Sequence, residues 1–310
     1  MRLQFEPPST YFVHVPKTGG ITLGSLLDLC FRRRESVQLN PPRMARISPE
    51  ELKSFRCYHA MHQGRTLLEL TGRSDLTCLT MLRDPIERSV SQIRYLQRVV
   101  KDIPHTFTQE YLEEVAPLLN ADLTKVLHVQ AFEAACDAQI RTLGIREDYR
   151  PLFKGSIDAE SGRSVLRPYP LPPLMDVSDR DALLANGVSW LSEMAVVGLT
   201  ERYPESVLMV CDVLGIPAPS SIPRKNANPS RNEGQSNYRK TLDSKVLGQL
   251  QELTRHDQLL YDHARELFEE QWSRYLRQPK KTYSISAHAR YSVKSPARRV
   301  LEFIRPGRRP

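Results

Sequence analysis

Short apolar runs alternate along the chain with longer stretches in which apolar residues recur every three or four positions. The runs 11–15, 76–82 and 195–199 are largely apolar and end at a proline or a polar residue, which is typical of strands buried on both faces of a sheet. The stretches 21–31 and 86–99 follow the first two runs and have helical spacing. Strands that alternate with helices in this way predict an α/β fold built on a parallel sheet.

Weaker patterns account for much of the remaining chain. They predict one more short strand at 56–59 and helices at 108–118, 132–143, 180–193, 205–214 and 241–272, the last of them broken once. The segments 145–177 and 217–240 are polar or rich in Pro and Gly, so we expect loops there. The expected organisation is a single domain in residues 1–276 and a basic, flexible C-terminal tail, 277–310.

The positive charge of the chain is concentrated in this tail. The whole chain has a formal charge of +8, but residues 277–310 hold ten Lys or Arg residues and one acidic residue, so the rest is close to neutral. A nucleic-acid-binding domain needs a basic folded face, and this distribution gives no support for one, so nucleic acid is not an expected partner. Three roles remain open for the tail: a solubilising segment, peripheral contact with an anionic membrane, or capture of an anionic polysaccharide.

The sequence contains no pattern typical of export or membrane insertion. It has no run of about 18 apolar residues, and the first residues lack the apolar stretch of a signal peptide. We therefore expect a cytoplasmic protein, for which a peripheral contact through the basic tail is the one membrane contact left open. The five cysteines are scattered and form no Cys-x-x-Cys pair, which predicts reduced thiols and gives no signal of a metal site.

The segment Val15-Pro-Lys-Thr-Gly-Gly-Ile-Thr22 is the first candidate for chemistry. A strand that feeds a glycine-rich turn and then a helix presents several backbone N–H groups at the positive end of the helix dipole, which is a geometry that binds phosphate or sulfate. Lys17 adds a full positive charge, and the Thr18 and Thr22 hydroxyls are further donors. The segment is not a Walker A loop, because its lysine precedes the glycines. An ordinary strand-to-helix turn is the alternative.

The second candidate segment is Leu82-Arg-Asp-Pro-Ile-Glu-Arg-Ser-Val-Ser91. Arg83 ends a predicted strand, at the edge where open α/β sheets bind ligands, and Ser91 follows about two helical turns later. The arginine fork and the serine hydroxyl can then reach one phosphate group. The alternative is a surface ion-pair cluster of Arg83, Asp84 and Arg88.

Taken together, the two segments resemble the sulfotransferases that use 3′-phosphoadenosine 5′-phosphosulfate (PAPS), and in particular the carbohydrate branch that includes heparan sulfate 2-O-sulfotransferase. The segment 12–20 is similar to the 5′-phosphosulfate loop of that family, and 82–91 is similar to its 3′-phosphate segment. Three weaker similarities follow in the expected order, at 137–141, 197–202 and 257–264. The resemblance covers roughly residues 10–270 and implies a P-loop-NTPase-like sulfotransferase fold.

The resemblance also implies a donor site and a reaction. The residues that would hold the 5′-phosphosulfate are Lys17, Thr18, Gly19, Gly20, Ile21 and Thr22. Arg83 and Ser91 would hold the 3′-phosphate. The implied reaction moves the sulfuryl group of PAPS to a hydroxyl of a sugar or glycan by in-line displacement, with Lys17 meeting the charge that grows on the leaving oxygen. No metal ion is expected.

The acceptor hydroxyl needs a base, and histidine suits that role near neutral pH. The resemblance assigns it to His59, with His62 as a second candidate, whereas His14 is expected to pack locally. Gln139 and Glu201 could face the ligands or form buried contacts of their own.

Two assignments remain open at this stage. The loop Arg224–Arg231 could cover the nucleotide, or it could be a solvated run of charge. The alternatives to the sulfotransferase function are a non-catalytic nucleotide- or glycan-binding protein on the same scaffold and a P-loop-type kinase.

Overall fold

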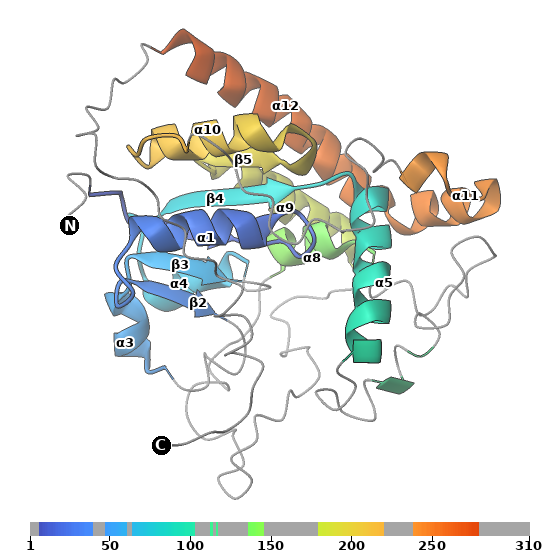
Figure 1. The fold of residues 1–310 in the computed structure, drawn as a ribbon, viewed down its shortest axis with the longest axis horizontal. Coiled ribbons are helices and arrows are strands. Elements are labelled where there is room, and N and C mark those ends of the chain that lie inside the picture. The colour runs from blue at the N-terminus through green and yellow to red at the C-terminus, as the bar shows by residue number, and fades with distance from the viewer. Residues whose placement is uncertain are drawn as a thin grey trace, which may run out of the picture. The chain divides into compact units, whose positions relative to one another are not determined.

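Five short strands form one all-parallel sheet in the described part of the chain, in the order β2-β3-β1-β4-β5 (Figure 1). The strands are β1 (Thr10–Val13), β2 (Ser36–Leu39), β3 (Cys57–Ala60), β4 (Thr77–Leu82) and β5 (Val196–Leu199). The chain leaves the central strand β1 toward β2 and β3 on one side and later continues through β4 to β5 on the other. The loops after β1 and β4 therefore lie side by side at a topological switch point, where open parallel sheets bind ligands.

The structure is a computed structural model that describes residues 6–39, 47–60, 64–102, 112–113, 116, 136–145, 179–219 and 238–278. All of these lie in one compact unit, Met1–Pro279. Several predictions fall outside the described residues: the greater part of the helix 108–118, most of the loops 145–177 and 217–240, His62, the segment 224–231 and the tail beyond residue 278. The boundary at 276 stays a prediction.

The helices follow the strands as the sequence pattern predicts for an α/β fold. They are α1 (Gly20–Cys30), α3 (Pro49–Ser54), α4 (Thr66–Thr71), α5 (Pro85–Asp102), α8 (Ala138–Gly144), α9 (Arg180–Glu193), α10 (Tyr203–Val213), α11 (Ser244–Leu253) and α12 (Arg255–Arg277), with 3-10 turns η3 (Thr200–Arg202) and η4 (Tyr238–Lys240). The predicted break in the long C-terminal helical stretch is confirmed, because α11 ends and α12 begins at Thr254. The strand β2 and the short helices α3 and α4 were not expected from the sequence.

Successive side chains of β1 cover opposite faces of the sheet, as strand geometry requires. Phe12 lies on the same face as His59 of β3, its register partner, and this face is covered by α1. Tyr11 points to the other face, where its ring lies 6.0 Å from that of Trp190 in α9. Figure 1 shows α1 and α10 in front of the sheet and α9 behind it. The sheet is thus a buried middle layer between helices.

A second hydrophobic cluster anchors α5 away from the sheet. Ile86, Val90 and Ile93 of α5 belong to the same cluster as Val246 and Leu250 of α11, and the two helices lie at the same end of the molecule in Figure 1. Because these apolar residues occupy one face of α5, the residues at the intervening positions are left to face the loop after β1.

Two glycines let α1 approach a buried histidine pair. A Cβ on Gly20 would overlap the ring of His14, and a Cβ on Gly24 would overlap the ring of His59. The two glycines lie one turn apart on the same face of α1. The close packing of α1 on the sheet therefore depends on hydrogen atoms at these two positions.

Gly24→Ala is expected to destabilise the protein, because the added methyl group overpacks a site whose neighbour is buried and hydrogen-bonded. The expected loss in the free energy of unfolding is about 1–3 kcal/mol, measured by urea denaturation. Gly248 in α11 is the matched control, since a Cβ there meets nothing within 4 Å, and Gly248→Ala should stabilise by about 0.5–1 kcal/mol. Equal effects at both positions would contradict the packing argument.

Candidate anion-binding site

The loop between β1 and α1 exposes backbone donors at the amino end of a helix. Lys17 and Gly19 both have left-handed backbone conformations, with φ of 73° and 83°. Within the described part of the chain, the N–H groups of Gly19, Gly20 and Ile21 donate no hydrogen bond, and Thr22 is the first residue of α1 to do so, to the Gly19 carbonyl at 3.1 Å. These three N–H groups lie at the positive end of the helix dipole and suit an anion.

The threonine side chains of the loop are less available than the sequence suggests. The Thr18 hydroxyl is fully buried and donates to the carbonyl of Val15 at 2.8 Å. Thr22 is also buried and hydrogen-bonds with the Tyr203 side chain. The expectation that both hydroxyls serve as ligand donors therefore fails for Thr18, whose proton already has a partner, and leaves the contribution of Thr18 to its backbone.

Arg83, which follows β4, contacts the loop directly. Its Nη1 donates to the carbonyl oxygen of Lys17 at 3.3 Å, and its Nη2 lies 3.3 Å from Oε2 of Glu87. The structure thus brings the two segments that the sequence singled out to one place. Arg83 retains further N–H donors for a ligand, because a guanidinium carries five.

The alternative of a mutual ion-pair cluster at Arg83, Asp84 and Arg88 does not describe this region. Asp84 pairs with Arg239 at 2.9 Å, and the fully buried Arg88 lies 3.8 Å from Asp257. Each of the three residues therefore has a different partner.

A buried glutamine clamps the backbone of Arg83. The side-chain Oε1 of Gln139 accepts from the Arg83 N–H, and its Nε2 donates to the Arg83 carbonyl, both at 3.0 Å. Gln139 is itself held by Asp257, whose carboxylate accepts from the N–H groups of Gln139 and Ile140 at the start of α8. Gln139 is fully buried. Of the two roles that the sequence left open for it, the structure shows the buried contact, in which Gln139 supports Arg83.

The end of β5 ties the same two loops together. The Thr200 hydroxyl lies 2.8 Å from the carbonyl oxygen of Thr18 and 3.0 Å from that of Leu82. Glu201 accepts from the N–H of Asp84 at 3.0 Å and from the Tyr261 hydroxyl at 2.8 Å. The three weakly similar sequence segments thus contribute residues that hold the loops after β1 and β4.

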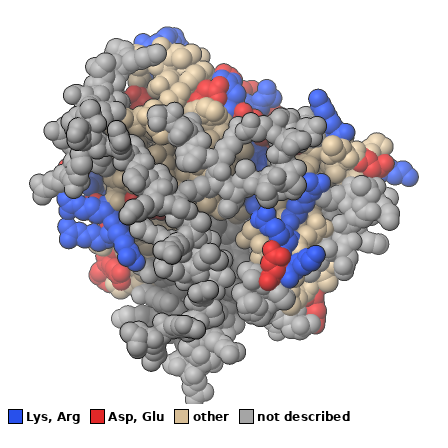
Figure 2. All heavy atoms as spheres, viewed as in Figure 1, with Lys and Arg blue, Asp and Glu red and all other residues tan. Residues whose placement is uncertain are grey.

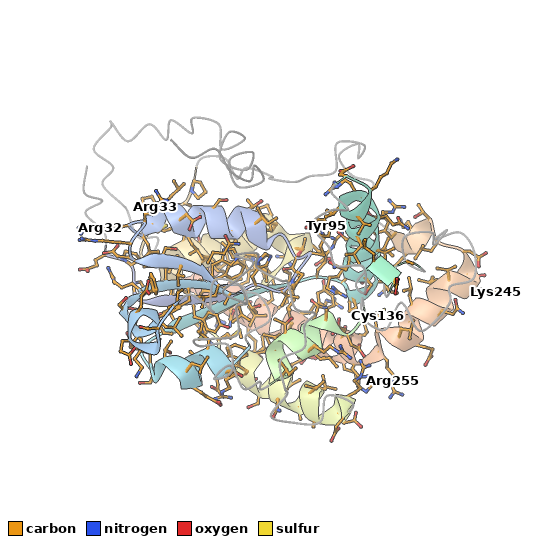
Figure 3. All side chains as sticks on the ribbon, turned by 90° about the horizontal axis from the view of Figure 1, so that it is seen from below. Arg32, Arg33, Tyr95, Cys136, Lys245 and Arg255 are labelled. Carbon is orange, nitrogen blue, oxygen red and sulfur yellow. The ribbon has the colours of Figure 1, made fainter. Side chains whose placement is uncertain are left out.

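Helix α5 forms the remaining wall of the site. The ammonium group of Lys17 lies 4.1 Å from the centre of the Tyr95 ring. Ser91 is half-buried and lies one turn before Tyr95 on α5, so the two share a face. In Figure 3, Tyr95 is labelled on the side of α5 toward α1. Ser91 therefore lies on the helix face that Lys17 contacts.

The site carries an excess of positive charge. The pKa of Lys17 is lowered to about 8, first by burial and then by the neighbouring charges of Arg98, Arg83 and Arg88. Among the described residues, no carboxylate lies within 4.0 Å of the Lys17 ammonium group. A lysine without a carboxylate partner beside free N–H groups is what an anion-binding site requires.

The predicted base lies beneath α1, away from the surface. His59 is 7% exposed, and its Nε2 lies 2.8 Å from Nδ1 of His14. Burial lowers the pKa of His59 to about 4. His14 is buried as well, in keeping with the expectation that it packs locally.

Two cavities also occur among the described residues, and the second of them is lined in part by Ile86 and by Arg239, the ion-pair partner of Asp84. A cavity of about 320 Å³ is lined by Arg65, Glu69, Leu143, Gly144, Asn186 and Ser189, and one of about 470 Å³ lies among α5, η4, α11 and α12. No group of three or more His, Cys, Asp or Glu side chains suited to a metal ion occurs in the described ranges. The same ranges contain no helix that is both long and apolar enough to cross a membrane.

Comparison with known proteins adds no assignment. No protein-family model matches the chain, and no curated protein matches it. The resemblance to sulfotransferases therefore stays a prediction from sequence motifs.

The burial of His59 predicts a pH dependence of stability. The unfolded chain gains a proton on His59 near pH 6.5, whereas the folded chain gains it only near pH 4. Between these values the unfolded state binds more protons, so the contribution of His59 to stability is complete above pH 6.5 and is lost as the pH falls. Since Asp257 also titrates near pH 6, the quantity to measure is the difference in unfolding free energy between the wild type and His59→Asn.

That difference should fall with decreasing pH, by about 1.4 kcal/mol per unit within the window. Urea unfolding at a series of pH values measures it, and the contribution of Asp257 is common to both proteins. A difference that stays flat across the window would show that His59 titrates as an exposed histidine does.

Proposed function

We propose that the protein is a PAPS-dependent sulfotransferase that transfers a sulfuryl group to a hydroxyl of a sugar or glycan, on a P-loop-NTPase-like sulfotransferase fold. The observation that carries the proposal is the contact of Arg83 with the carbonyl of Lys17. This contact joins the two segments that resemble the 5′- and 3′-binding elements of that family. The excess of positive charge around Lys17 supports it.

The donor would be held at both ends. The 5′-phosphosulfate would lie against Lys17 and the N–H groups from Gly19 to Ile21, and the 3′-phosphate between Arg83 and Ser91. Glu87 orients Arg83 without using all of its donors. The presence of a 3′-phosphate is what would separate PAPS from ATP.

In the proposed reaction the acceptor oxygen forms a bond to sulfur while the bond from sulfur to the bridging phosphate oxygen breaks. The negative charge moves onto the leaving phosphate, where the Lys17 ammonium group stabilises it, and the hydroxyl proton passes to a base. His59 remains our candidate for the base, and its hydrogen bond to His14 orients its ring.

A second candidate function is a protein that binds a nucleotide or glycan without catalysis. The burial of His59 and the contact of its Nε2 with His14 favour this alternative. The two candidates share the donor site and differ in turnover, so binding and transfer need separate tests.

Nucleotide binding is expected to stabilise the protein by mass action. At a concentration 100-fold above its Kd, adenosine 3′,5′-bisphosphate should add about 2.7 kcal/mol to the free energy of unfolding, seen as a rise in Tm. ATP should add far less, since it lacks the 3′-phosphate. Lys17→Met should abolish the rise, and equal stabilisation by ATP would argue against a PAPS site.

Transfer from labelled PAPS to a panel of sugars, lipids and phenols separates the two candidates. Lys17→Ala should abolish transfer. His59→Asn should lower the rate by a factor of about 10²–10⁴ if it removes a general base, while the affinity for adenosine 3′,5′-bisphosphate stays near that of the wild type. If His59→Asn lowers transfer and affinity in parallel with Tm, His59 supports packing and is not the base.

A further inference from the structure

A second cation faces the same aromatic ring as Lys17. The Tyr95 ring has the Lys17 ammonium group 4.1 Å from its centre and the Arg98 guanidinium 5.9 Å from its centre. Tyr95 is 38% exposed, and Arg98 is an exposed residue almost one turn further along α5. The sequence analysis singled out neither Tyr95 nor Arg98, because the significance of both depends on the position of the Lys17 side chain in the folded chain.

Neither cation has an acidic partner within the described residues. No carboxylate lies within 4.0 Å of Lys17 or Arg98 there, although Asp102 lies one turn after Arg98 on α5. Figure 2 shows Lys and Arg side chains gathered along the position of α5. The other carboxylate of α5, Glu87, pairs with Arg83.

This arrangement is unfavourable for the chain alone. Arg98 is the first of three charges that lower the pKa of Lys17, after burial itself, so the two cations repel each other. An aromatic face attracts cations only weakly, whereas an anion placed between a lysine and an arginine forms charge-assisted hydrogen bonds with both. An anion bound by both side chains would offset the repulsion between Lys17 and Arg98. Its hydrogen bonds would replace the weaker contacts of these cations with the Tyr95 ring.

We propose that Arg98 is an additional donor-binding residue, which together with Lys17 holds the phosphosulfate end of the nucleotide from the α5 side. The inference rests on the proposed function for the identity of the anion. It assigns Arg98 to the 5′ end because Lys17 belongs to the loop at that end, whereas Arg83 and Ser91 serve the 3′ end. The loop and α5 then hold the transferring group from opposite sides.

The test compares two adenosine nucleotides on variants that each lose one positive charge from α5. In Arg98→Gln, the affinity for adenosine 3′,5′-bisphosphate should fall about tenfold, the equivalent of one charge-assisted hydrogen bond, as measured by titration calorimetry. The affinity for adenosine 3′-phosphate, which lacks the 5′ group, should stay within about twofold of the wild type.

Arg94→Gln is the matched control. Arg94 is exposed as well, but its guanidinium lies 4.5 Å from the centre of the Tyr238 ring, so its loss should leave both affinities unchanged. Equal losses for both nucleotides in Arg98→Gln, or losses no larger than in Arg94→Gln, would overturn the assignment of Arg98 to the 5′ end.

Inorganic pyrophosphate separates this inference from the proposed function. If the wild type fails to bind adenosine 3′,5′-bisphosphate but binds pyrophosphate with a dependence on Arg98, the anion subsite holds and the sulfotransferase proposal is rejected. If the wild type binds adenosine 3′,5′-bisphosphate and Arg98→Gln binds it equally well, the proposed function survives and the role of Arg98 is rejected. Absence of binding to either probe rejects both.

Discussion

Hydrogen bonds from the side chains of Gln139, which is buried, and Thr200, which is half-buried, to the backbone of the loops after β1 and β4 are the constraint on which the site depends. Gln139 pairs with both the N–H and the carbonyl of Arg83, and Thr200 lies within hydrogen-bond distance of the carbonyls of Thr18 and Leu82. A buried backbone group without a partner costs about as much free energy as a lost hydrogen bond. These contacts therefore hold the two loops in their observed conformations. The positions of Lys17 and Arg83 follow from that.

The same network allows the chain to concentrate positive charge. Arg88 is buried against Asp257, and Asp257 in turn accepts from the N–H groups that begin α8. Burial raises the pKa of Asp257 to about 6, while the charge of Arg88 opposes that rise. Lys17 and Arg98 have no comparable acidic partner in the described ranges. The buried charge of Arg88 is therefore compensated by Asp257. The charges of Lys17 and Arg98 are available to a ligand, and this is the physical basis of the proposed donor site.

The sequence predicted most of the parallel sheet because buried strands and the helices after them have distinct apolar patterns. It missed β2, where two apolar residues, Val37 and Leu39, alternate with polar ones in an edge strand too short to stand out. It also predicted a hydroxyl donor at Thr18 and left open whether Gln139 faces a ligand or forms buried contacts; both side chains hydrogen-bond to the protein backbone. Side-chain direction within a loop or a short helix depends on the neighbours that pack against it, which no local pattern contains.

The alternation of strands and helices, the glycine turn and the placement of Lys17 and Arg83 at strand ends were determined by the sequence itself, because periodicity and backbone freedom are local properties. The meeting of those two residues, the burial of His59 against His14 and the approach of Arg98 to Lys17 were decided only in the folded chain. These contacts join residues that lie far apart in the sequence, and they depend on which side of a helix faces its neighbour. They exist because the sheet topology makes the ends of β1 and β4 neighbours and because the second hydrophobic cluster turns α5 toward the loop.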